Sequence, residues 1–228
     1  MGHLNIISFF WIIILVFYSR YVMKQKEITR SKFLKIQLLI LLVYNIVILI
    51  IFPWKIPVEL STVAYFIVPI IVLFNISTLK AWGVYSSLIS GVIYFAAMII
   101  FGNYLYEDYP AYGVYAAIYS HGALLSYAYI TLSTVKIQKS ERMVIWIGII
   151  FSASWALLLR PFVIFEARIF IYEVLDGLFV RTYFPENLTI GYIIYYILFV
   201  IALFLSANIV HLLSQSLYKN HKDVVVNK

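Results

Sequence analysis

Apolar residues occur along this chain in runs of about 20 residues, and the short stretches between the runs carry most of the charges. The apolar positions do not alternate strictly with polar ones, so the pattern favours helices over strands. A run of this length is long enough to cross the hydrocarbon core of a bilayer as a helix. The sequence predicts seven such helices, at residues 4–19, 33–52, 58–76, 81–101, 112–132, 143–159 and 188–213.

The composition supports the same class of protein. Hydrophobic residues make up 64% of the 228 residues and charged residues only 12%, and the mean hydropathy is +0.96. Soluble domains contain about 25% charged residues. Hydrocarbon offers no hydrogen-bond partners to the backbone, so each span must be helical or part of a closed barrel. We therefore expect an all-α, polytopic membrane helix bundle that forms one integral membrane domain over residues 1–228.

The basic residues lie mostly in alternate loops. Six follow the first run, between Arg20 and Lys35, and others come at Lys80, at 136–142 and in the tail at 214–228. The positive-inside rule places these segments in the cytoplasm, with the N-terminus outside and the C-terminus inside. A six-span alternative, with the sixth segment re-entrant, would break this pattern at the tail. The net charge of +7 then reflects orientation in the membrane, and we expect no nucleic-acid partner.

The segment at 160–181 differs from the spans because it is too charged to cross a membrane. Glu166, Glu173 and Asp176 recur at helical spacing among Phe, Ile, Leu and Val residues. This pattern is typical of an amphipathic helix on a membrane surface. We expect it on the outer surface, either as a connector or as a lid over a cavity.

Small residues recur four positions apart in three of the predicted spans, at Gly83, Ser87 and Gly91 in the fourth, Gly113 and Ala117 in the fifth, and Gly148 and Ser152 in the sixth. Such stripes allow neighbouring backbones to approach closely in lipid. The stripe in the fifth span leads to His121, so we expect His121 to face protein and not lipid. Asn45 and Asn208 are expected to hydrogen-bond between helices.

His121 is the main candidate for a functional residue. It lies within Ser120-His121-Gly122, among alanine, leucine and tyrosine residues. An ionisable side chain inside a membrane costs free energy and is by default a candidate site. The alternative is a packing histidine whose polar atoms are satisfied.

Glu59, Ser61 and Arg160 are the other polar candidates. Glu59 and Ser61 stand near the start of the third span, where a carboxylate also stabilises a helix N-terminus. Two residues of separation put these side chains about 200° apart on a regular helix, so both can face His121 only if the helix starts irregularly. Arg160, before Pro161, is a candidate for binding a headgroup or a phosphate.

These features in this order resemble the YwaF-like integral membrane family. The resemblance rests on the basic first loop, on 56–61 at the start of the third span, on the acidic, proline-bearing loop at 107–110, on Ser120-His121-Gly122, and on the basic tail. It implies acyl transfer between lipids, with a cysteine nucleophile and a histidine base. His121 would be the base, Ser61 stands in place of the cysteine, and Glu59 stands where the family has histidine.

The resulting hypothesis is a membrane protein with a polar site around His121 that handles a lipid or another amphiphile by acyl transfer. Its catalytic residues would be His121 and Ser61, and its substrate-binding residues Glu59 and Arg160. The alternative is a non-catalytic scaffold, accessory subunit or small-molecule carrier. We expect membrane lipids as partners, no cofactor or metal, and a place in a bacterial plasma membrane. The chain contains no cysteine, which excludes disulfides and thiolate metal sites.

Overall fold

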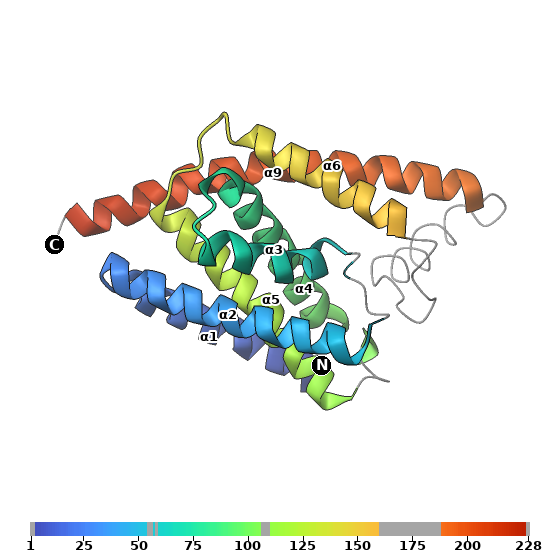
Figure 1. Ribbon diagram of the computed structural model, residues 1–228, viewed down its shortest axis with the longest axis horizontal. Helices are drawn as coiled ribbons and strands as arrows, with labels where there is room; N and C mark the ends of the chain where they lie inside the picture. The colour runs from blue at the N-terminus through green and yellow to red at the C-terminus, as the bar shows by residue number, and fades with distance from the viewer. Residues whose placement is uncertain (1–2, 54–56, 58, 106–109, 160–187, 227–228) are drawn as a thin grey trace.

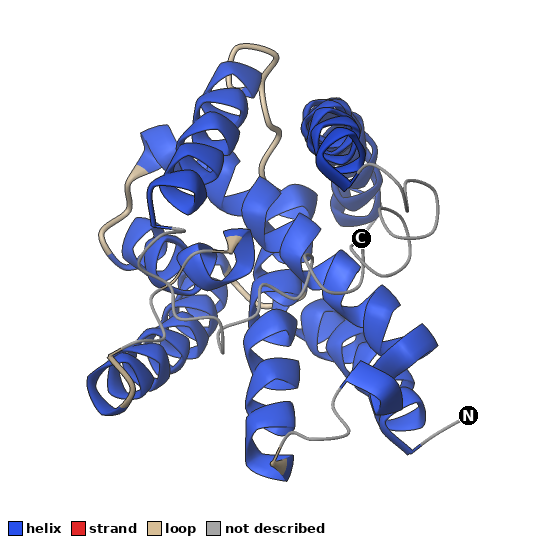
Figure 2. Cartoon of the chain, turned by 90° about the vertical axis from the view of Figure 1, so that its right-hand side faces the viewer, coloured by secondary structure: helices blue, strands red, loops and turns tan. Residues whose placement is uncertain are grey.

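A computed structural model describes residues 3–53, 57, 59–105, 110–159 and 188–226. All regular secondary structure in these residues is helical, which confirms the all-α class (Figure 2). The elements are α1 (His3–Met23), α2 (Glu27–Ile51), α3 (Leu60–Leu73), the short 3-10 helix η1 (Ser77–Leu79), α4 (Lys80–Leu105), α5 (Ala111–Thr134), α6 (Arg142–Leu159) and α9 (Leu188–Val226).

Helix α5 is the centre of the bundle. It contacts α1, α2, α3, α4 and α9, and nearly all of its side chains from Ser120 to Ser133 are buried. The residues of α5 are mostly alanine, serine, glycine, tyrosine and leucine, and small side chains allow several helices to approach one backbone. The helix with the candidate histidine is therefore the most enclosed one.

The outer helices carry apolar side chains on their exposed faces. Phe17 of α1 is 67% exposed and Ile50 of α2 is 71% exposed. Large exposed apolar surfaces of this kind are unfavourable in water and suit a lipid environment. Four segments are long and apolar enough to cross a membrane, namely His3–Met23, Glu27–Ile51, Ser77–Gly102 and Val200–Asn220. The architecture is that of a helical membrane protein.

The basic segments gather at one end of the bundle. In Figure 1 the turn between α1 and α2, the connection from α5 to α6 and the C-terminus all lie toward the left, away from the N-terminus. Lys80 at the start of α4 interacts electrostatically with Glu141 and with Glu27 of α2. Successive helices therefore run in opposite directions, and the positively charged loops share one end.

Most helices extend a few residues beyond the predicted spans, but α3 is shorter than predicted and α9 is much longer. Helix α3 has 14 residues, a length of about 21 Å, and it ends where Asn75 takes a positive φ of 55°. Asparagine tolerates this left-handed conformation, which terminates helices. Helix α9 has 39 residues and continues through Val226, so the predicted tail at 214–228 begins inside a helix. Ser214 is buried there and accepts a hydrogen bond from the Ile137 backbone N–H at 2.8 Å.

The small-residue stripes pack against neighbouring helices in most cases. A Cβ atom added to Gly91 would lie 2.7 Å from the Leu125 Cβ of α5, and one added to Gly148 of α6 would overlap the Trp82 ring of α4. At Gly113 an added Cβ would meet Pro110 Cγ at 3.8 Å and no other atom of the described residues within 4 Å. The packing role is confirmed at Gly91 and Gly148, and the described residues show no close helix contact at Gly113.

Candidate functional site

His121 lies in the middle of α5 and is buried, with 8% of its surface exposed. The prediction that it faces protein is confirmed. Ser120 and Gly122 beside it are buried as well, so the Ser120-His121-Gly122 motif is enclosed on all sides by other helices. An imidazole in such a place must find its partners inside the bundle.

Two tyrosine rings pack against the imidazole ring. The Tyr94 ring of α4 stacks on it with a centroid distance of 3.8 Å and an interplanar angle of 7°. The Tyr65 ring of α3 contacts the imidazole edge to face, with a centroid distance of 5.4 Å and an interplanar angle of 76°. Three helices, α3, α4 and α5, thus fix the orientation of one side chain.

Several buried polar atoms on α4 and α5 have no hydrogen-bond partner among the described residues. They include His121 Nδ1 and the hydroxyl groups of Ser87 and Ser90 on α4. The neighbouring Ser86 hydroxyl, by contrast, donates to the Gly83 carbonyl at 3.2 Å, which is the usual solution for a serine in a membrane helix. A buried polar group left unpaired costs about 1–3 kcal/mol. This part of the bundle therefore has unused hydrogen-bonding capacity.

The other side of the motif faces α1. An added Cβ at Gly122 would lie 2.8 Å from Trp11 Nε1, so the glycine makes room for the indole. Trp11 Nε1 and the hydroxyl of Ser8, one turn away on α1, also lack a hydrogen-bond partner within the described ranges. Polar groups with unused capacity therefore occur on α1, α4 and α5.

Ser61 and Glu59 lie together, but neither forms a hydrogen bond with His121 among the described side chains. The Ser61 hydroxyl donates to Glu59 Oε2 at 3.4 Å. Glu59 precedes the first turn of α3 with φ −75° and ψ 154°, an extended conformation, so the 200° separation of a regular helix does not apply. Ser61 is one turn before Tyr65, which contacts His121. The described contacts therefore bring Ser61 to Glu59 and Tyr65 to His121, and none of them joins Ser61 to His121.

A second polar cluster centres on Gln37 of α2, which the sequence analysis did not single out. Its side-chain N–H groups donate to the Ala123 carbonyl at 2.9 Å and to the Ser126 hydroxyl at 2.6 Å on α5. Its side-chain oxygen accepts from the Tyr18 hydroxyl of α1 at 2.7 Å. The signal was present, because Gln37 is an uncharged polar residue inside an apolar run.

The two asparagines differ from each other. Asn208 of α9 accepts a hydrogen bond from Arg142 Nη1 of α6 at 2.8 Å, as expected for an interhelical residue. Asn45 donates to the Leu41 carbonyl of its own helix at 2.8 Å, and the described residues show no interhelical hydrogen bond for it. The polar residue that joins α2 to other helices is Gln37.

Two other predictions have no structural counterpart here. Arg160 and the segment at 160–181 lie outside the described residues. In the described part of the chain, no group of three or more His, Asp or Glu side chains could hold a metal ion.

The chain was compared with protein-family models, with curated proteins and with solved structures. No family model, curated protein or solved structure matches it.

Proposed function

We propose that the chain crosses the membrane seven times, through α1 to α6 and α9, with its N-terminus outside and its C-terminus in the cytoplasm. The shared basic end of the bundle supports this orientation, because positive loops are retained on the cytoplasmic side. In this orientation α5 enters from outside at Ala111, and His121 lies about 15 Å along the helix axis from that end. The candidate site is then in the outer half of the bundle.

At this site we propose that the protein binds the polar part of a lipid or of another amphiphile. The observation that carries the proposal is His121 Nδ1, a buried ring nitrogen with no hydrogen-bond partner among the described residues. The unpartnered hydroxyls of Ser87 and Ser90 on α4 add groups that both donate and accept. A ligand with hydroxyl or ester oxygens matches this set, and apolar helices around the site suit an acyl chain.

Acyl transfer is the reaction that the resemblance to the YwaF-like family suggests for this site. In such a reaction the nucleophile's oxygen attacks a lipid ester while a base accepts its proton, and the leaving alcohol takes that proton. The acyl group then moves to the hydroxyl of a second lipid. The Ser61 hydroxyl donates to Glu59, and Ser61 lies about 6 Å along α3 from Tyr65, whose ring contacts His121. For Ser61 to act with His121, its hydroxyl must leave Glu59 and approach the imidazole.

A non-catalytic role, as a scaffold, accessory subunit or carrier, has an observation in its favour. The Ser61 hydroxyl points to the Glu59 carboxylate and not to a histidine. A carboxylate is a weak base for a serine hydroxyl, because the pKa of a carboxylic acid is far below that of an alcohol. Binding at His121 without covalent chemistry is therefore the second candidate.

The binding proposal is tested with a phospholipid that carries a photoactivatable diazirine. His121→Phe keeps an aromatic ring to stack on Tyr94 and removes both ring nitrogens. We expect this variant to keep the wild-type unfolding temperature and to lose about 5-fold in photolabelling, the equivalent of one hydrogen bond. His211→Phe is the control for loss of a buried imidazole on another helix, because His211 of α9 is also 8% exposed. Its Nε2 hydrogen-bonds to Gln215, whereas its Nδ1, like that of His121, has no partner among the described residues.

Equal labelling of the wild type, His121→Phe and His211→Phe would show that His121 is a packing residue. The reaction is tested separately, in cells where deletion of the protein changes the acyl composition of membrane lipids. Acyl transfer requires that Ser61→Ala and His121→Phe both fail to restore that composition. Restoration by Ser61→Ala together with failure of His121→Phe would support binding without Ser61 chemistry.

A further inference from the structure

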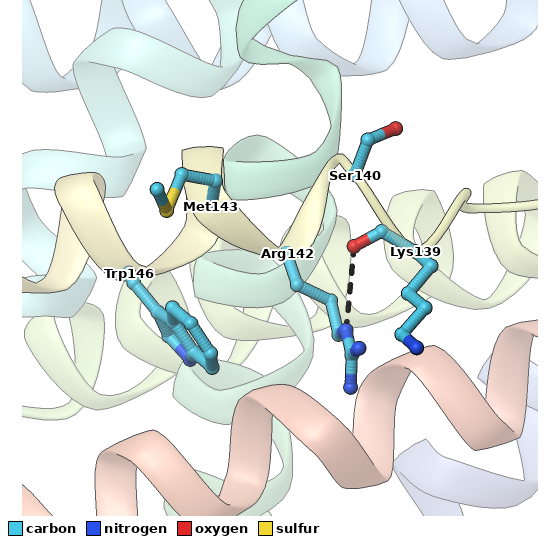
Figure 3. Close-up of a pocket in the computed structure, with 5 residues that line it drawn as sticks. All are labelled: Lys139, Ser140, Arg142, Met143 and Trp146. Carbon is cyan, nitrogen blue, oxygen red and sulfur yellow. Dashed lines mark hydrogen bonds between the residues drawn. The ribbon is translucent and has the colours of Figure 1, made fainter.

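A shallow pocket with a volume of about 480 Å³ lies at the start of α6 and is open to the surface (Figure 3). In Figure 3 the side chains of Lys139, Arg142 and Trp146 extend toward α9, and the Ser140 hydroxyl points the opposite way. The residues that line the pocket are Lys139, Ser140, Arg142, Met143 and Trp146.

The guanidinium of Arg142 is held in place by two hydrogen bonds. Its Nε donates to the Lys139 carbonyl at 3.3 Å, and its Nη1 donates to Asn208 Oδ1 at 2.8 Å. A guanidinium has five N–H groups, so three remain for a ligand. The Lys139 side chain is exposed, and its ammonium has no hydrogen-bond or ion-pair partner within the described part of the chain. The pocket therefore presents two cations, one of them positioned in advance.

Glu141 lies between the two cations in the chain, and no ion pair joins its carboxylate to Lys139 or Arg142 in the described residues. The Glu141 carboxylate accepts a hydrogen bond from the Gln138 backbone N–H. Guanidinium and ammonium groups that share a pocket favour a phosphate, since charge-assisted hydrogen bonds to its oxygens are short and strong.

An apolar surface continues from the cationic wall along α6. Met143 is 61% exposed, and Ile147 and Ile150 on the next turns are 61% and 55% exposed. The Trp146 ring packs against Phe204 of α9 at a centroid distance of 6.0 Å, at the level where α6 begins. Tryptophan is enriched where a membrane surface meets the hydrocarbon. A ligand here would meet cations at one end and an apolar helix face at the other.

From this arrangement we propose that the pocket binds an anionic phospholipid. Lys139 and Arg142 contact the phosphate, and the acyl chains lie over Met143 and Ile147. The site is separate from the one at His121, because 13 residues of α5, about 20 Å, lie between His121 and the end of that helix. It occupies the basic end of the bundle, so the proposal does not depend on the function proposed for His121.

The test measures the affinity of the full-length protein in detergent for the first bound lipid, by native mass spectrometry with phosphatidylglycerol or phosphatidylcholine. We expect Lys139→Gln to weaken phosphatidylglycerol binding about 5-fold, and Lys139→Gln with Arg142→Gln about 25-fold, with phosphatidylcholine binding unchanged. Lys136→Gln is the matched control, because Lys136 is an exposed lysine three residues away that does not line the pocket. It should change the affinity less than 2-fold.

Three results would overturn the proposal. One is an equal loss of phosphatidylglycerol affinity in Lys136→Gln and Lys139→Gln, which would indicate a general effect of positive charge and not a specific site. Another is unchanged phosphatidylglycerol affinity in a Lys139→Gln protein that unfolds at the wild-type temperature without lipid. The third is displacement of the lipid by glycerol phosphate at equal concentration, which would assign the pocket to a soluble phosphate.

Discussion

Gly91 provides a sharp test of how α4 and α5 create the environment of His121. A Cβ atom added there would lie 2.7 Å from the Leu125 Cβ, 3.2 Å from the Leu125 Cα and 3.2 Å from the His121 carbonyl oxygen. Two of these three contacts are with backbone atoms, which a change of side-chain rotamer cannot relieve. Gly91→Ala must therefore push α4 away from α5.

The size of the effect follows from these distances. Raising the closest contact from 2.7 Å to an ordinary 3.4 Å requires a shift of about 0.7 Å between the helices, and overpacking of this kind costs about 1–3 kcal/mol. Alanine is intrinsically better than glycine in a helix by about 1 kcal/mol, so part of the cost is offset. The shift would also disturb the ring stack of Tyr94 on His121, whose centroid distance is 3.8 Å.

Gly113→Ala is the control, because it makes the same glycine-to-alanine change without a close contact. Among the described residues its added Cβ would meet only Pro110 Cγ, at 3.8 Å. We expect Gly91→Ala to unfold about 2–12 °C below Gly113→Ala, the equivalent of the overpacking cost for a chain of this length. The assay is thermal unfolding in detergent followed by intrinsic tryptophan fluorescence. The reasoning is refuted if Gly91→Ala is as stable as Gly113→Ala.

Three further substitutions test other contacts by the same assay. Gln37→Met removes the hydrogen bonds that join α1, α2 and α5 and should lower the unfolding temperature by about 4–8 °C, since interhelical hydrogen bonds in membranes contribute about 0.6 kcal/mol each. Ser214→Ala leaves the buried Ile137 N–H without its acceptor and should lower the unfolding temperature by about 2–12 °C. Gly148→Ala places a methyl group inside the Trp82 ring and should reduce the yield of folded protein more than any other change.

Matched controls separate these contacts from general effects of substitution. Gln25→Met removes only a 3.3 Å bond to the Tyr21 carbonyl at an exposed position, so it should leave stability unchanged. Ser216→Ala changes an exposed serine on α9 and should be neutral. If either control lost as much stability as its partner variant, the energies assigned to Gln37 and Ser214 would be wrong. Folded, wild-type-like Gly148→Ala protein would show that Trp82 packs elsewhere.

The arrangement of the helices along the chain was predictable because it depends on local properties. The length of an apolar run limits where a spanning helix can lie, and each of the seven predicted runs overlaps a helix of the structure. The small residues leading to His121 correctly predicted a face buried in protein, since only small side chains allow other helices so close. The basic loops share one end because successive helices alternate in direction.

Which side chains meet was decided by tertiary structure alone. Helical periodicity gives the face of a helix on which His121 lies, but the axial offset between α4 and α5 decides that Tyr94 stacks on it. The same limit hid the role of Gln37, whose partners are on α1 and α5. Glu59 reaches Ser61 because its backbone is extended before α3 begins, which no helical pattern can show.

The sequence by itself thus determined the class of fold, the positions of the helices and the burial of His121. These follow from the transfer of apolar runs out of water and from the hydrogen-bonding needs of the backbone in lipid. The partners of His121 and the cationic pocket at Arg142 depend on contacts between helices far apart in the chain. Those contacts are set by how the side chains of several helices pack at once, and only the folded structure specifies that packing.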